Sequence, residues 1–329
     1  MKRSTLINLI VTLISIFAVL LTAEIIMRFA WKMGGWVERP IYQRSFNPYL
    51  RYELVPGENF SATSINADGF RGRDYQVPKG PETFRIIMVG DSETLSVKLP
   101  DKDTLPYQLQ ELLNQNSEGI NYEVLNFGVE GYCTFQELEM LKTKGLKYEP
   151  DLIILNYVLN DPEPGEYYFQ KNFFIRHSAL VRYFTFRIKK RLIKKERKAL
   201  GIDTEIDNYY YYHQPKYFDR VKDAILEMSE IAGDSNHKLL VVIFPTSSIM
   251  VKDFRANYPY WPLHELVRGI KSKNMATIDL LDEFNRLNLT PQEVSIDYEY
   301  DESHKNPHAL GVAAEYIYRT MKKERLIPQ

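Results

Sequence analysis

Five short apolar runs, separated by segments with helical periodicity, restrict the fold of this chain more than any other feature of its sequence. They occupy residues 84–90, 122–128, 151–158, 238–245 and 276–281. Nearly every position in these runs is apolar, which is typical of strands covered on both faces of a parallel sheet. The alternation of strands and helices predicts an α/β fold with a mostly parallel, five-stranded open sheet and helices on both faces.

Capping signals help to place the helices between these runs. Thr134 is expected to cap one helix, because threonine is favoured at that position, and the helix should stop at Gly145. Pro307 should open the last helix, since proline fits the first turn. The other helical patterns cover residues 105–115, 216–233 and 260–273.

Polar residues follow the ends of several apolar runs. Ser92 follows the first, Gly131 the second and Asn160 the third, and Asp301 and His304 come after the last. Ligands of open parallel sheets bind at the carboxyl ends of the strands, so we expect these residues to lie close together. A serine becomes a nucleophile when a histidine oriented by a carboxylate takes its proton. Backbone and amide N–H groups could stabilise the resulting oxyanion, so the set fits acyl transfer.

The four blocks that carry these residues resemble those of the SGNH, or GDSL, hydrolase superfamily. They read GDSET, NFGVEGYCT, VLND and DESHKN, in the family's order, and the resemblance covers about residues 84–325. It implies a flavodoxin-like three-layer α/β/α sandwich and ester hydrolysis or acyl transfer with no metal or other cofactor. The triad that it implies is Ser92, Asp301 and His304. The oxyanion hole that it implies is Ser92, Gly131 and Asn160.

Some positions depart from the family's pattern, and others offer alternatives to it. Val158 stands in the third block where the family usually has Gly, and Lys305 stands in the last block where it often has Pro. Gly128 is an alternative oxyanion glycine. Asp297 is an alternative acid, although its separation from the histidine is a poorer match.

Other polar residues near these blocks have structural interpretations. Asp91 and Asp161 are expected to stabilise their loops by hydrogen bonding, and Ser92 alone could be a helix cap. His308 lies four residues after the histidine of the last block, a spacing seen in metal sites, but no third ligand is evident. Cys133 is the single cysteine, so an intrachain disulfide is excluded and we expect a packing role.

The N-terminus carries a charge-free run from Ser4 to Ala23, preceded by Lys2 and Arg3. About 20 residues at 1.5 Å per residue match the roughly 30 Å hydrocarbon core of a bilayer. A cleaved signal peptide usually has a shorter apolar region and a small-residue cleavage site, which LLTAE matches poorly. We therefore expect residues 1–36 to form a cytoplasmic stub and an uncleaved single-pass anchor. The catalytic domain would then be extracytoplasmic, either periplasmic or at the cell surface.

The remaining segments complete the predicted domain organisation. Residues 37–83 are irregular and aromatic, so we expect a connector that packs on the hydrolase domain of residues 84–325. An insertion at about 163–215 interrupts the alternation. Within it, residues 182–198 mix cations with apolar side chains, which suits either a solvated helix or contact with an anionic surface. The run YYYY at 209–212 could line a cleft or simply pack.

The composition and the resemblance together indicate which classes of function this chain could have. The 42 basic and 43 acidic side chains give a formal net charge of −1, which does not favour nucleic acid as a partner. The resemblance and the anchor imply a serine esterase or acyltransferase acting on O-acyl, chiefly O-acetyl, groups of a cell-surface or exported carbohydrate. The alternatives are a lipid or thioester hydrolase at the membrane and a non-catalytic polysaccharide-assembly protein. Hydrolases and transferases share one triad, so the sequence leaves that choice open.

Overall fold

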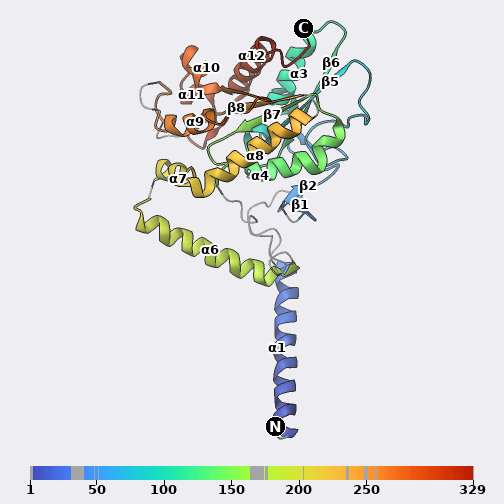
Figure 1. Ribbon diagram of the computed structural model, residues 1–329, viewed down its shortest axis with the longest axis vertical. Coiled ribbons are helices and arrows are strands. Elements are labelled where there is room, and N and C mark those ends of the chain that lie inside the picture. Colours follow the sequence, from blue (N-terminus) through green and yellow to red (C-terminus); the bar gives the residue numbers. More distant parts are fainter. Residues whose placement is uncertain are drawn as a thin grey trace. The chain divides into compact units, whose positions relative to one another are not determined.

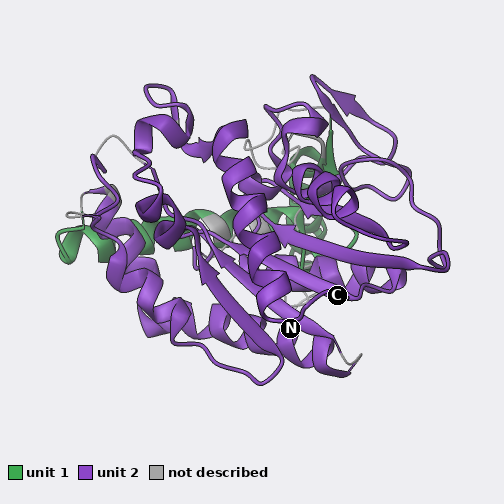
Figure 2. Cartoon of the chain, turned by 90° about the horizontal axis from the view of Figure 1, so that it is seen from above, with its two compact units in different colours: residues 1–52, 166–202 green, residues 53–165, 203–329 purple. Residues whose placement is uncertain are grey.

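The chain forms two compact units, which Figure 2 colours separately. One comprises residues 1–52 and 166–202, and the other comprises residues 53–165 and 203–329. The predicted anchor and connector meet within residues 31–40, which lie outside the described residues, as do residues 164–173 of the predicted insertion. The computed structural model describes residues 3–30, 41–47, 49–50, 52–163, 174, 177–202, 204–234, 237–247, 251–255 and 258–328.

A five-stranded parallel sheet forms the centre of the second unit (Figure 1). Its order is β6-β5-β7-β8-β9, and every neighbouring pair is parallel. The strands are β5 (Thr83–Gly90), β6 (Asn121–Gly128), β7 (Leu152–Tyr157), β8 (Lys238–Ile243) and β9 (Met275–Asp279). Most positions of β5 to β8 are buried, which explains why apolar residues occupy consecutive positions instead of alternating. The predicted fold class and its five strands are confirmed.

Helices cover both faces of this sheet (Figure 1). One face carries α3 (Leu105–Gln115), α10 (Leu280–Arg286) and α12 (Pro307–Lys323). The opposite face carries α4 (Thr134–Met140) and α8 (Pro215–Asp234). The unit also contains α2 (Ser92–Leu95), α7 (Glu205–Tyr212), α9 (Trp261–Arg268), α11 (Pro291–Val294), β3 (Asn59–Phe60) and β4 (Thr63–Ser64).

The start and end of α4 differ from the prediction. Cys133 occupies the N-cap position, and Thr134 is the first helical residue. The hydroxyl of Thr134 instead donates a hydrogen bond to Asp161 Oδ2 at 2.9 Å, so it is not available for capping. Regular α-helix ends at Met140, and a π-helical turn then continues as far as Gly145.

Residues 53–83 of the predicted connector are part of the second unit and pack within it. Phe70 stacks on Phe127 with 4.4 Å between the ring centroids. The buried guanidinium of Arg71 donates to the carbonyl oxygens of Leu95 and Leu99, each at 2.6 Å. Arg71 therefore fixes the loop that follows α2.

The first unit contains α1 (Arg3–Ala30), α6 (Ala179–Ala199) and β1 (Tyr42–Arg44). Along the sequence, the division between the units falls after the first residue of β2 (Tyr52–Leu54). Within α1, the 25 residues Ser4–Arg28 contain an apolar window with a mean hydropathy of 2.6 and no buried residue. This segment is long and apolar enough to cross a bilayer, and its length and composition fit either an anchor or a signal sequence.

Candidate active site

Ser92 is the first residue of α2 and directly follows the strand β5 and Asp91. Asp91 caps this short helix, because its Oδ1 accepts a hydrogen bond from the backbone N–H of Glu93 at 2.9 Å. The helix packs so close to β6 that a Cβ at Gly128 would lie 2.3 Å from the backbone nitrogen of Leu95. Gly128 is therefore needed for close packing against the short helix that Ser92 begins.

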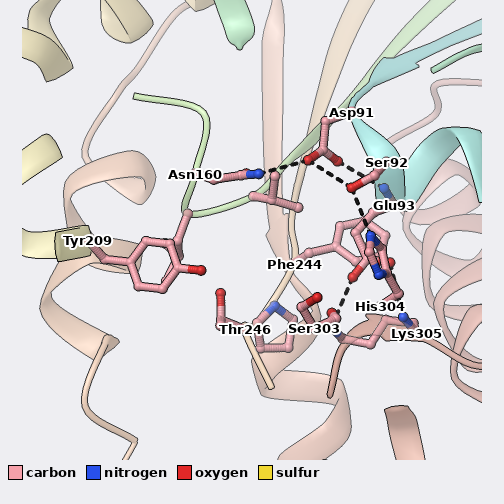
Figure 3. Close-up of a pocket in the computed structure, with 13 residues that line it drawn as sticks. Asp91, Ser92, Glu93, Asn160, Tyr209, Phe244, Thr246, Ser303, His304 and Lys305 are labelled. Atoms are coloured by element: carbon pink, nitrogen blue, oxygen red, sulfur yellow. Dashed lines mark hydrogen bonds and ion pairs between the residues drawn. The ribbon is translucent and has the colours of Figure 1, made fainter. Parts of the chain in front are cut away.

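The structure brings Ser92, His304 and Asp301 together in one line of hydrogen bonds. Figure 3 shows the part of this line that joins Ser92 to His304. The Oγ of Ser92 lies 2.9 Å from Nε2 of His304, and Nδ1 of the same ring lies 2.5 Å from Oδ1 of Asp301. Both distances lie within the range of hydrogen bonds. The arrangement can transfer a proton from the serine to the imidazole while the carboxylate stabilises the resulting positive charge.

His304 and Asp301 lie on a short strand that is not part of the parallel sheet. The strand β11 (Asp301–Lys305) pairs in antiparallel fashion with β10 (Ser295–Asp297). Asp297 accepts hydrogen bonds from the backbone N–H groups of Glu299 and Tyr300, at 3.0 and 3.2 Å. Asp297, the alternative acid, thus stabilises the turn of this hairpin.

The charges around the site favour an ionised Asp301 and a basic His304. Burial opposes ionisation of Asp301, but hydrogen bonds from His304 and Lys98 lower its pKa to about 2. Lys98 Nζ lies 2.6 Å from Asp301 Oδ2, on the side away from the imidazole contact. Burial alone would lower the pKa of His304, yet the hydrogen bond to Asp301 and the negative charges of Glu93 and Asp301 raise it. These shifts suit a general base that works near neutral pH.

A buried ion pair joins the residue that follows Ser92 to the residue that follows His304. Lys305 Nζ lies 3.2 Å from Glu93 Oε1, and the backbone N–H of Lys305 donates to Glu93 Oε2 at 3.1 Å. Glu93 directly follows Ser92, and Lys305 directly follows His304. The pair therefore fixes two catalytic candidates that lie 212 residues apart in the sequence. Lys305 is one of the positions that depart from the family's pattern.

Asn160 and Gly131, the two predicted oxyanion donors other than Ser92, differ in their placement. Asn160 lines the pocket, and its Nδ2 donates a hydrogen bond to Asp91 Oδ2 at 3.1 Å. Gly131 is exposed, has a φ of +73°, and is not among the described residues that line the pocket. The structure thus places Asn160 in the same pocket as Ser92 and leaves Gly131 outside the described pocket lining.

Asp91 and Asp161 are both buried, and Asp91 is also part of the pocket lining. Asp91 Oδ2 lies 3.3 Å from Ser92 Oγ in addition to its contact with Asn160, and burial raises the pKa of Asp91. Burial, together with the charge of Asp91, also raises the pKa of Asp161. The hydrogen bonds of both carboxyl groups hold their loops, which is the role predicted from the sequence.

The pocket beside Ser92 has a volume of about 210 Å³ (Figure 3). Sequence reasoning missed much of its lining, although residues 244–246 directly follow β8 and the strand-end rule applies to them as well. Val158, a departure from the family's pattern, also faces this pocket. The lining residues outside the predicted triad and oxyanion hole are Asp91, Glu93, Val158, Leu159, Tyr209, Phe244, Pro245, Thr246, Ser303 and Lys305.

The wall of the pocket opposite Ser92 is held by a buried polar chain. The hydroxyl of Tyr258 accepts a hydrogen bond from the backbone N–H of Thr246 at 2.9 Å and lies 3.1 Å from His264 Nε2. His264 Nδ1 in turn lies 2.8 Å from Asp279 Oδ2. This second histidine–aspartate pair is buried and is not among the described residues that line the pocket, so its role is to position the wall.

The tyrosine run has both of the roles that the sequence allowed. Tyr209 lines the pocket from α7, and its hydroxyl points toward the cavity in Figure 3. Tyr211 and Tyr212 are buried. Among the described residues, no group of three or more His, Cys, Asp or Glu side chains could hold a metal ion, and His308 is exposed.

Comparisons with known proteins give structural relatives only. No protein-family model and no curated protein matches the chain. It is similar to a two-domain esterase (CEX) active on acetylated mannans, with a TM-score of 0.44 and 13% identity over 75% of this chain and 50% of that one. It thus spans half the length of that esterase. It is also similar to the acetyl xylan esterase AlAXEase, with a TM-score of 0.44 and 15% identity over 72% and 99% of the chains.

A third neighbour is described as a lipolytic protein of the G-D-S-L family from Desulfitobacterium hafniense DCB-2. It has a TM-score of 0.41 and 13% identity over 71% of this chain and 98% of that one. The structural neighbours are SGNH/GDSL esterases.

Proposed function

We propose that this chain is an SGNH-type serine esterase or acyltransferase that forms an acyl-enzyme at Ser92. The observation that carries the proposal is the line of hydrogen bonds from Asp301 through His304 to Ser92. In the first step, His304 takes the hydroxyl proton while Ser92 Oγ attacks the ester carbonyl. The imidazolium then gives this proton to the leaving oxygen as the carbon–oxygen bond breaks.

The second step releases the acyl group. A water molecule or an acceptor hydroxyl attacks the acyl-enzyme, and His304 takes the proton of the attacking oxygen. The proton then returns to Ser92 Oγ as the acyl bond breaks. Hydrolase and transferase activities differ only in which oxygen attacks, so both belong to the same proposal.

The proposed oxyanion donors are the backbone N–H of Ser92 and the side-chain amide of Asn160, with Gly131 as the third predicted donor. An asparagine amide has two N–H bonds. One N–H of Asn160 is held by Asp91, so the second is available for an oxyanion and its direction is fixed in advance. Donors fixed before the reaction stabilise the transition state without a cost of reorganisation.

The pocket favours a short acyl group. Its volume of about 210 Å³ is below the roughly 300–1,000 Å³ of sites that enclose drug-sized ligands. Val158, Leu159 and Phe244 offer an apolar wall, while Tyr209 and Thr246 offer hydroxyl groups. A ring that carries a hydroxyl suits a sugar face, so we propose O-acetyl groups of a surface or exported carbohydrate as the substrate.

We further propose that α1 is an uncleaved anchor, that the catalytic unit is extracytoplasmic, and that residues 182–198 contact an anionic surface. The side chain of Glu24, near the end of α1, makes hydrogen bonds with the first residues of α6. A segment with these contacts belongs to a folded unit, which supports the anchor over a signal sequence that is removed.

The test is acetate release from O-acetylated glycans by the full chain in detergent, with and without an added acceptor sugar. We expect Ser92→Ala to abolish release and Ser303→Ala, a matched change of another pocket serine, to retain it. Transfer of acetate to the acceptor would identify a transferase. Full release by Ser92→Ala would contradict the proposal.

The alternative, a lipid or thioester hydrolase, predicts faster reaction with long acyl chains than with short ones, which the small pocket disfavours. Rates on a series of esters of increasing chain length separate the two. A non-catalytic assembly protein would retain its biological phenotype in Ser92→Ala.

A further inference from the structure

The helix α6 begins at the end of α1, within the same unit. Glu24 of α1 accepts hydrogen bonds from the backbone N–H groups of Ala179 (2.8 Å) and Leu180 (2.9 Å) and from the hydroxyl of Ser178 (2.7 Å). Arg28 donates to a backbone carbonyl just before α6 at 2.7 Å. The N–H groups in the first turn of a helix have no partner within that helix. In α6 they donate to a side chain of α1, and this contact fixes one helix against the other.

This junction lies in the last two turns of α1, at the end of the apolar segment Ser4–Arg28. Glu24 and Arg28 are the first charged side chains after the run from Ser4 to Ala23. Charged side chains mark the boundary between the hydrocarbon core and water. If α1 spans the bilayer, as proposed above, α6 begins at the membrane–water boundary.

An apolar stripe runs along α6. Its members Val181, Phe184, Ile188 and Leu192 follow one another at intervals of three, four and four residues, so they share one face of the helix. Their exposed fractions are 37%, 54%, 54% and 59%. Large apolar side chains in a continuous exposed row mark a surface that meets a partner or a membrane.

Cations flank this stripe. The helix contains nine Lys or Arg residues and one Glu, which gives nine minus one, or eight, net positive charges. Arg191 and Lys195 follow Ile188 and Leu192 by three residues, so they lie beside the stripe on the helix surface. An apolar face bordered by cations is typical of helices that lie in the interface of anionic membranes.

We propose that α6 lies in the membrane interface, with its apolar stripe among the acyl chains and its cations against anionic lipid headgroups. The proposal rests on the anchor part of the proposed function and not on its chemistry. The occupant follows from two observations: the junction with α1 sets the depth of α6, and its charge matches anionic headgroups.

The test places a fluorescent label on each side of α6 in the full chain, reconstituted into phosphatidylcholine vesicles with and without phosphatidylglycerol. Cys133→Ala removes the single native cysteine. Ile188→Cys then puts the label on the stripe, and Lys190→Cys puts it on the opposite side as the matched control. With phosphatidylglycerol present, we expect quenchers attached to lipid to reach the label at 188 and aqueous iodide to reach the label at 190.

The charge contribution is tested by Arg191→Gln combined with Lys195→Gln. Each cation near an anionic surface changes the partition coefficient of a segment between water and the membrane interface by about fivefold. The α6 helix of the double variant should therefore partition into the interface about twenty-five-fold more weakly. The matched control, Lys102→Gln with Lys222→Gln, removes the same charge from exposed positions of the other unit and should leave the label at 188 buried.

Equal access of iodide to the labels at 188 and 190 in anionic vesicles would overturn the proposal. Hydrolysis of a soluble short-chain ester by the same preparations checks the fold and separates the two claims. Active protein with both labels exposed would refute the interfacial helix, whereas a buried label at 188 in inactive protein would support it and count against the esterase.

Discussion

The buried pair of Glu93 and Lys305 gives a prediction whose size follows from its burial. The exposed fractions of the two side chains are 7% for Glu93 and 1% for Lys305, and Lys305 Nζ lies 3.2 Å from the carboxylate. Lys305→Met removes the cation and leaves the Glu93 charge buried without compensation. Breaking a buried pair in this way costs about 3–5 kcal/mol, a large part of the roughly 5–15 kcal/mol that stabilises a typical domain.

The double variant Glu93→Gln with Lys305→Met removes both charges and retains an acceptor for the backbone N–H at position 305. Replacing both partners of a buried pair is often close to neutral. We therefore expect the double variant to recover most of the lost unfolding free energy, with a coupling of about 2 kcal/mol between the two sites.

The assay is urea unfolding of the full chain in detergent, followed by circular dichroism, for the wild type, both single variants and the double variant. Turnover of a short-chain ester is measured in parallel. A shift of about 1 Å in His304 relative to Ser92 would cost about a hundredfold in kcat, so Lys305→Met should lose both stability and turnover. The claim that the pair acts as a unit would be refuted if the losses of unfolding free energy in the two single variants sum to that of the double variant within about 0.5 kcal/mol.

The single variant Glu93→Gln also tests the pH dependence of activity. The negative charge of Glu93 helps to raise the pKa of His304. Glu93→Gln should therefore lower that pKa. His304 must be neutral to act as a base, so activity should persist to lower pH in the variant, and an unchanged acid limb of the kcat/KM profile would contradict this.

Three further substitutions test individual contacts. Asn160→Ala should lower kcat by about 10²–10³-fold with little change in KM if the amide is an oxyanion donor, and an equal change in both constants would count against that role. Lys98→Met should lower kcat by about fivefold, because a half-exposed ion pair with Asp301 is worth at most about 1 kcal/mol, and a loss above a hundredfold would contradict this limit. Arg71→Met should lower the unfolding free energy by about 3 kcal/mol, since it leaves buried carbonyl oxygens without a donor; thermal or urea unfolding measures this, and an unchanged midpoint would refute it.

The strands of this fold could be predicted because burial on both faces makes their sequences apolar throughout. The position of the candidate site followed from a geometric rule, since Ser92, Asn160 and residues near His304 all lie beyond the carboxyl ends of parallel strands. Both predictions rest on regularities that extend over whole segments.

Other features depend on contacts between distant residues and carry no local signal. The sequence offers no reason to pair Glu93 with Lys305, which are 212 residues apart. The hydroxyl of Thr134 prefers Asp161 to the helix start, and that partner comes from another strand end. The β10–β11 hairpin has only three and five residues in its strands, too few for a period to be visible.

The central claim is that Ser92 becomes acylated with His304 as its base. Its most direct test is reaction of the folded full chain with a fluorophosphonate, followed by peptide mapping of the adduct by mass spectrometry. We expect the adduct on Ser92, and we expect its loss in Ser92→Ala and in His304→Ala but not in Ser303→Ala. An adduct on Ser303, or no adduct on Ser92 in folded protein, would contradict the claim.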